Sequence, residues 1–158
     1  MKFKVLFMTV SAVLLSGCLS SYTIPQDEHI ATLEIPKPYS DTGFGYASAQ
    51  DFLISELDED GCSDKSQLIT EDTFIEDGML VPAEREIVIA SRWRRFGGST
   101  HTMCNAYIAV LFEADSHYEL DAKRGFNSCG IRIKNSETGD ILASTRLRDN
   151  GFSICKVK

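Results

Sequence analysis

Short apolar runs separated by turn residues recur along the chain from residue 30 to its end. The clearest, 129–134, places Ile131 and Ile133 on one face and Arg132 and Lys134 on the other. This period of two is typical of a half-buried β-strand. Short apolar runs predict further strands at 30–35, 50–57, 79–82, 86–93, 104–112, 117–121, 141–147 and 152–157. The segment 67–75 fits neither the strand period nor the helix period well, and we interpret it as extended. The pattern as a whole predicts an all-β domain of about eight short strands.

Prolines and two-faced strands indicate where some of these elements lie. Pro36 and Pro38 follow the first strand, which should end there or lie at a sheet edge because proline lacks a backbone donor. The segment 104–112 is apolar on both faces and predicts a central strand. Strands of this kind beside alternating strands favour an antiparallel β-sandwich, immunoglobulin-like in general shape.

Turn residues suggest the connections. Residues 135–140 are turn-forming and predict a hairpin between 129–134 and 141–147. Residues 39–47, with two glycines and little alternation, read as a loop. We expect one domain to occupy residues 30–158, since the length suits a single core.

The first eighteen residues follow a different pattern. Lys2 and Lys4 precede an apolar run at 5–15 that is shorter than the about 20 residues needed to span a bilayer. These are the features of a secretory signal. The sequence then continues Leu15-Ser16-Gly17-Cys18, which resembles the lipobox of bacterial prolipoproteins.

That resemblance implies cleavage between Gly17 and Cys18, with a thioether-linked lipid on the sulfur and an acylated amine, palmitate being the expected acyl chain. Residues 1–17 would be the signal peptide and 18–29 the lipid anchor with a flexible tether. In enterobacterial lipoproteins an Asp after the lipidated Cys retains the protein in the inner membrane. Here the position holds Leu19, so the resemblance implies the outer membrane, with the domain facing the periplasm. The alternative is an ordinary cleaved signal, with Cys18 as one more thiol.

The net charge of the chain limits the classes of partner that we expect. The formal net charge is −7, and removal of Lys2 and Lys4 with the signal would lower it to −9. A strongly acidic chain disfavours nucleic acid and adhesion to anionic lipid. We therefore expect no nucleic-acid partner, and contact with the membrane only through the lipid on Cys18.

Four further cysteines, Cys62, Cys104, Cys129 and Cys155, form an even set in an exported chain and predict two disulfides. Three connectivities are open. If 129–134, 141–147 and 152–157 form a meander, Cys129 and Cys155 lie two strands apart, which is too far for a disulfide. We place Cys104 and Cys129 at one end of a sheet, which favours Cys104–Cys129 and Cys62–Cys155. The other possibility is free structural thiols.

The spacing Cys104-x7-Phe112-x5-Tyr118-x10-Cys129 is similar to a pattern in uncharacterised small bacterial β-sandwich lipoproteins. Those proteins often carry Pro and Gly between the Phe and the Tyr, whereas this chain has Glu113-Ala-Asp-Ser-His117. The resemblance implies a fold and no activity.

One local excess of cationic and aromatic residues stands out: Arg92-Trp93-Arg94-Arg95-Phe96. In a strand, Arg92 and Arg94 would share one face, opposite Trp93 and Arg95. Such a patch can bind an anionic sugar, a lipid phosphate or a carboxylate of a partner protein. Alternatively, the arginines protect an edge strand from pairing and bind acidic side chains of this protein.

Other candidate chemistry is sparse. Asp58, Asp60 and Asp64 surround Gly61 as a weak calcium loop, although the spacing departs from the EF-hand and we favour a solvated acidic turn. His29, His101 and His117 lack a metal-binding spacing and read as surface histidines. We expect no cofactor, no metal site and no catalytic residue.

These observations predict a noncatalytic lipoprotein of the outer membrane that binds an envelope protein or serves as a structural module. The alternative is a tethered inhibitor or accessory subunit of an exported enzyme or secretion system. An envelope hydrolase is a third hypothesis, for which no residue set can be nominated.

Overall fold

The computed structural model of the chain describes residues 19–23, 26, 29–57, 61–63, 66–75, 78–125 and 128–144. Several predictions lie outside these residues: the lipidated Cys18, the calcium loop at Asp58, Asp60 and Asp64, the predicted strand 152–157, and Cys155. No helix in the described ranges is long and apolar enough to cross a membrane.

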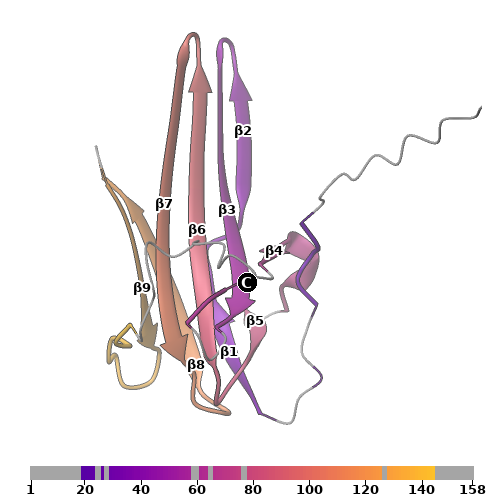
Figure 1. Cartoon of the computed structure of the whole chain (residues 1–158), viewed down its shortest axis with the longest axis vertical. Helices are drawn as coiled ribbons and strands as arrows, with labels where there is room; N and C mark the ends of the chain where they lie inside the picture. The colour runs from indigo at the N-terminus through magenta and orange to yellow at the C-terminus, as the bar shows by residue number, and fades with distance from the viewer. Residues whose placement is uncertain are drawn as a thin grey trace, which may run out of the picture.

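Two β-sheets pack against each other, which confirms the predicted all-β sandwich (Figure 1). The first, which we call the long sheet, has the order β2-β3-β6-β7, with β4 also paired to β3; the second, the short sheet, has the order β5-β1-β8-β9. The strands are β1 (Ile30–Glu34), β2 (Tyr39–Gly43), β3 (Tyr46–Glu56), β4 (Gln67–Ile69), β5 (Met79–Pro82), β6 (Glu86–Gly97), β7 (Thr100–Leu111), β8 (His117–Arg124) and β9 (Cys129–Asn135), and a 3-10 turn, η1, spans Glu71–Thr73.

The two sheets differ in strand length. β3, β6 and β7 have 11 or 12 residues, whereas the strands of the short sheet have between four and eight. At about 3.3 Å per residue, the long strands outreach the short sheet, and Figure 1 shows two hairpins that project beyond it. We call this projecting part the distal extension: β2, residues 46–51 of β3, 92–97 of β6 and 100–105 of β7.

The core fills the space between the short sheet and the proximal half of the long sheet. Alternate residues of each strand point into it, as the period of two requires. The largest fully buried side chains include Phe52, Phe112, Leu33, Ile87, Ile89 and Ile133. Tyr118 and Leu120 are buried as predicted, and Ile131 packs against the same cluster.

The prediction that 104–112 is a central strand is wrong, because β7 forms the edge of the long sheet. The apolar residues on its second face have a different cause. Ala109 is fully buried together with Leu53, Val88 and Ala90 on the outer face of the long sheet, away from the main core. β7 therefore has apolar residues on both faces because the outer face of the long sheet is also buried near the core. It does not have them because a strand lies on each side of β7.

The prediction that the arginine-rich strand protects a sheet edge is also wrong. β6 lies between β3 and β7 along its whole length. β1 ends before Pro36 as predicted, yet it is an interior strand, antiparallel to β5 and parallel to β8. The parallel pair is an exception to the predicted antiparallel arrangement.

Residues 39–47, predicted as a loop, instead form the β2–β3 hairpin around Phe44 and Gly45. All five residues of β2 are exposed. A strand that buries no side chain needs no hydrophobic alternation, so its sequence carries no strand signal. In the described residues, the predicted hairpin of 129–134 with 141–147 is limited to one bridge, Lys134 to Ile141, beside which the Leu142 N–H donates to the Ile133 carbonyl at 2.9 Å.

The Cys104–Cys129 disulfide is confirmed. The sequence argument placed both cysteines in one sheet, whereas the bond joins β7 of the long sheet to β9 of the short sheet. Cys62 is also a disulfide cysteine, and its predicted partner Cys155 lies outside the described residues.

Part of the predicted tether packs on the domain. Leu68 of β4 donates its backbone N–H to Ser20 and accepts from the N–H of Tyr22, both at 2.8 Å. The Tyr22 ring belongs to the core cluster, and its hydroxyl donates to the Leu80 carbonyl at 2.9 Å. Residues 20–22, which the prediction assigns to the tether, therefore pack against the domain.

We expect Tyr22→Ala to lower the free energy of unfolding by about 2–4 kcal/mol, because a core aromatic ring is lost. Tyr22→Phe removes only the hydrogen bond to Leu80 and should cost about 1 kcal/mol. Urea denaturation measures both, with Thr23→Ala, an exposed neighbour, as the control. Equal stability of all three variants would show that residues 20–22 do not contribute to the fold.

Candidate functional site

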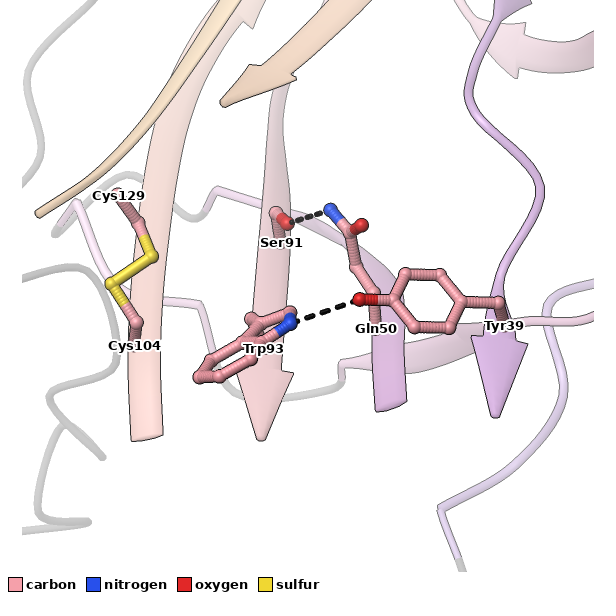
Figure 2. The surroundings of a disulfide bond; sticks show 6 residues. All are labelled: Tyr39, Gln50, Ser91, Trp93, Cys104 and Cys129. Carbon is pink, nitrogen blue, oxygen red and sulfur yellow. Dashed lines mark hydrogen bonds between the residues drawn. A yellow bond between two sulfur atoms is a disulfide. The ribbon is translucent and has the colours of Figure 1, made fainter. Parts of the chain in front are cut away.

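Trp93 marks the boundary between the core and the distal extension. Its side chain is buried, and its indole Nε1–H donates to the Tyr39 hydroxyl of β2 at 2.9 Å. Opposite it on β7 is Cys104, whose disulfide leads to β9 (Figure 2). The guanidinium carbon of Arg124 lies 3.2 Å from the centre of the indole ring, a cation–π contact. Side chains from β2, β6, β7, β8 and β9 thus converge where the long strands leave the core.

A second polar contact sits beside this boundary. The Gln50 side-chain amide of β3 donates to the Ser91 hydroxyl of β6 at 3.0 Å (Figure 2). Ser91 is buried, and an unsatisfied hydroxyl there would be costly. The hydrogen bond from Gln50 satisfies the Ser91 hydroxyl. These two polar side chains therefore stabilise the pairing of β3 with β6.

On the opposite face of the long sheet, two arginines share one carboxylate. Arg92 Nη2 lies 3.0 Å and Arg94 Nη2 lies 2.6 Å from Asp51 Oδ2, and the Asp51 side chain is only 18% exposed. Arg94 Nε is buried and has no acceptor among the described residues. The predicted face-sharing of Arg92 and Arg94 is confirmed, and so is their pairing with an acidic residue of the same chain.

Tyr107 of β7 borders this cluster. Burial raises the pKa of its phenol, against smaller lowering effects of the Asn105 side chain and of Arg92. The phenol therefore stays protonated at neutral pH and is a neutral neighbour of the arginines.

The end of the distal extension exposes aromatic side chains. Phe44, in the β2–β3 turn, is fully exposed at 108%, and Tyr46 and Phe96 are 42% and 43% exposed. Phe96 stacks on His101 of β7 with ring centres 4.3 Å apart. The two hairpins are joined at this end, because Tyr46 pairs with Gly97 and the Gly98 N–H donates to the Gly45 carbonyl at 3.3 Å. Tyr46 lies on the face of the long sheet that bears Trp93, whereas Phe96 lies on the opposite face with Arg92 and Arg94. Phe44 lies in the turn at the end of the β2–β3 hairpin.

The composition of this region differs from that of the whole chain. Residues 39–50 and 92–105 include aromatic residues, three arginines and a methionine, but no Lys and no Glu. Tyr, Trp, Phe, Met and Arg are enriched at the centres of protein–protein interfaces, whereas Lys and Glu are depleted. The distal extension therefore shares the aromatic residues, Met and Arg of such interface centres, but it also contains Asp, Ser and Ala, which are depleted there.

The structure divides the predicted patch at 92–96. Trp93 is a buried support, and Arg92 and Arg94 are tied to Asp51, so only Arg95 and Phe96 remain exposed for a partner. Sequence reasoning missed Phe44. An apolar ring between Gly43 and Gly45 in a polar segment was the available signal, since turns normally hold small polar residues.

The remaining candidates do not assemble a site. All three histidines are exposed, as predicted, and His29 lies 3.6 Å from Glu84 at the surface. An open groove of about 1050 Å³ beside β1 is lined in part by Glu34, Lys37 and His117. In the described part of the chain no hydrogen bond or ion pair joins these three side chains, and no group of metal-binding residues occurs.

Comparison with known proteins identifies no matching family model, no similar curated protein and no similar solved structure.

We expect Asp51→Ala to lower the free energy of unfolding by about 1–3 kcal/mol, because it leaves two half-buried guanidinium groups without a carboxylate. Arg95→Ala should change it by less than about 0.5 kcal/mol, since its side chain is exposed. Urea denaturation at neutral pH separates the two variants. The ion-pair geometry would be contradicted if Arg95→Ala were the more damaging change.

Proposed function

We propose that the protein is a noncatalytic, lipid-anchored lipoprotein of the outer membrane that binds another envelope protein through the end of its distal extension. The exposure of Phe44 is the observation that carries this proposal. A phenyl ring left wholly in water at the end of a hairpin gains nothing for folding, whereas burial in a partner would release about 2 kcal/mol. Tyr46 and Arg95 lie on the same face of the long sheet and extend this surface, which we call the end surface.

The chemistry of this surface suggests its partner. The single Asp51 carboxylate binds both Arg92 and Arg94 and compensates one of their two positive charges, whereas Arg95 is the exposed arginine of the three. A matching surface offers an apolar pocket for Phe44 with a carboxylate at its rim. Association with such a surface is favourable even though the chain as a whole is acidic.

The noncatalytic assignment is supported by how the polar groups are used. Tyr39 accepts from Trp93, Gln50 donates to Ser91, and Asp51 binds arginines, so each holds the extension together. The same end surface serves the alternative function of a tethered inhibitor or accessory subunit. The identity of the captured partner distinguishes the two functions.

Anchoring at Cys18 is supported by the lipobox resemblance. Since Ser20 and Tyr22 pair with Leu68, only Leu19 separates Cys18 from the first paired residue. Two residues of extended chain span about 7 Å. A lipid on Cys18 would therefore hold the β4 edge of the domain close to the bilayer.

Mass spectrometry of the protein from native membranes should find a chain that begins at Cys18 and carries three acyl chains. Cys18→Ser should remove the lipid and release the protein from the membrane fraction, because a lipid anchor with more than one chain is required for stable attachment. A mature chain with an unmodified Cys18 in native membranes would contradict the anchoring.

Photo-crosslinking in intact cells, with the crosslinking residue at Tyr46, should capture one predominant envelope protein. Phe44→Ser together with Arg95→Glu should reduce that capture about tenfold or more, because an anchor residue and the only exposed cation of the end surface are lost. The variant should keep wild-type stability.

Ile75→Ser is the matched control, because Ile75 is 44% exposed and lies outside the distal extension. It should leave the capture unchanged. Equal capture by wild type and by the Phe44→Ser, Arg95→Glu variant would reject the end surface as the binding site.

A further inference from the structure

The four sheet edges of the sandwich differ in how they are protected against pairing with another strand. An unpaired edge strand is a template for a further strand, and proteins usually protect it with charge, proline, short length or a covering segment. β5 is four residues long and ends in Pro82, and β9 carries Arg132 and Lys134. On the β3 side of the long sheet, β2 carries Asp41, and β4 is covered by Ser20–Tyr22. Three edges are thus protected.

The fourth edge, β7, lacks charge, proline and short length, and β9 lies next to it at the Cys104–Cys129 disulfide. Its twelve residues include no Asp, Glu, Lys, Arg, Pro or Gly, and its register with β6 runs from Thr100 to Leu111 without a bulge. Residues 100–103 and Asn105 are exposed. In the ranges that the structure describes, β7 pairs with β6 alone. Its distal half is therefore a regular, uncharged and open edge.

The register indicates which backbone groups point outward. Gly97 and Thr100 flank a two-residue turn, so this pair exchanges both of its hydrogen bonds. Because hydrogen-bonded and non-hydrogen-bonded pairs alternate in an antiparallel ladder, the N–H and C=O groups of His101, Met103 and Asn105 face the open edge.

We propose that the distal half of β7 pairs antiparallel with β7 of a second copy of this chain, around a twofold axis at Thr102. A twofold axis perpendicular to the sheet keeps the two faces of each copy in register. Thr102 then lies opposite Thr102 of the second copy, and His101 lies opposite its Met103, the pair whose outward groups exchange hydrogen bonds. The two long sheets form one continuous sheet.

The side chains on the outer face favour a second copy. Phe96 and His101 already stack on this face, and Met103 is 53% exposed beside them. In the proposed pair, Met103 of one copy extends the Phe96–His101 stack of the other, and sulfur–aromatic contacts of this kind are favourable. Because of the twofold symmetry, this contact occurs twice. Each contact covers apolar surface that is exposed to water in the single chain.

Charge does not oppose the pairing. Arg95 lies opposite Thr102 on the adjacent strand β6. The two Arg95 positions would be three strand spacings apart, about 14 Å, which exceeds the screening length of about 8–10 Å in physiological salt. The edge itself carries no formal charge at neutral pH with His101 neutral, so two acidic copies can approach at this point.

The pairing does not depend on the function proposed above. The partner-binding residues Phe44 and Arg95 are not on the open edge, and loss of one interaction leaves the other testable. Strand pairing over about seven residues covers less than a standard interface of about 1,600 Å². We therefore expect reversible association.

The test uses the full chain in native membranes with Thr102→Cys. Directly opposite residues of a non-hydrogen-bonded pair have Cα atoms about 4.5 Å apart, within the range for a disulfide. We expect a dimer on non-reducing gels and, after digestion, a peptide joined to itself through position 102. Thr42→Cys, at the exposed β2 edge of the same sheet, should give at most about one tenth of the dimer that Thr102→Cys gives.

A non-covalent test uses two tagged copies of the full chain, co-expressed and captured through one tag. Met103→Pro removes an outward donor and should reduce co-capture about tenfold or more, whereas Thr42→Pro on the opposite edge should not. Met103→Lys, which keeps the backbone donor and adds a charge at the open edge, should also disrupt co-capture, and Met103→Leu should retain it. Peptide mapping checks that Cys104–Cys129 is intact in each variant.

Equal dimer yield from Thr102→Cys and Thr42→Cys would overturn the proposal, as would co-capture that survives both Met103→Pro and Met103→Lys. A disulfide from position 102 to a different protein, without self-linkage, would also overturn it and would assign the edge to a foreign strand.

Discussion

The difference in strand length between the two sheets determines the rest of this structure. The short sheet, with strands of four to eight residues, covers only the proximal half of strands that are 11 or 12 residues long. Hydrophobic burial therefore stabilises the long hairpins at one end only. Beyond Trp93 they depend on backbone pairing and on contacts at the boundary. The extension is a four-stranded sheet with no second layer among the described residues, so the boundary contacts connect it to the core.

The disulfide, the indole ring and Arg124 supply those contacts. Cys104–Cys129 closes a loop of 25 residues, which the chain-entropy model values at about 3.5 kcal/mol. It joins the sheets at the point where the core ends, and Trp93 fills the space beside it under the Arg124 guanidinium. The Trp93–Tyr39 hydrogen bond carries this support across to β2, the outermost strand. The projecting hairpins are thus connected to the core through covalent, aromatic and polar contacts.

Sequence reasoning succeeded where one face of a strand is buried. The alternation of Ile131 and Ile133 with Arg132 and Lys134 reports burial directly, and β9 forms there. It failed for β2, which buries nothing and leaves no pattern. It also failed for β7, because apolar residues on both faces do not distinguish an interior strand from an edge strand covered on its outer face. The expectation that β6 is an edge strand failed because arginines do not show where a strand lies in its sheet. The disulfide was predicted correctly, but from a placement of both cysteines in one sheet, whereas they lie in different sheets.

The candidate site was predictable only in part, for a related reason. The excess of arginine and aromatic residues at 92–96 identified the correct strand, but sequence alone could not show that Asp51 lies beside two of its arginines. That carboxylate is more than forty positions away in the sequence and becomes a neighbour only through the β3–β6 register. Phe44 joins the surface through the same register. The binding surface is therefore a product of strand pairing, as is the open edge of β7. Strands that extend past their core gain no further burial within the chain, and their exposed rings and unpaired backbone groups remain available to other molecules.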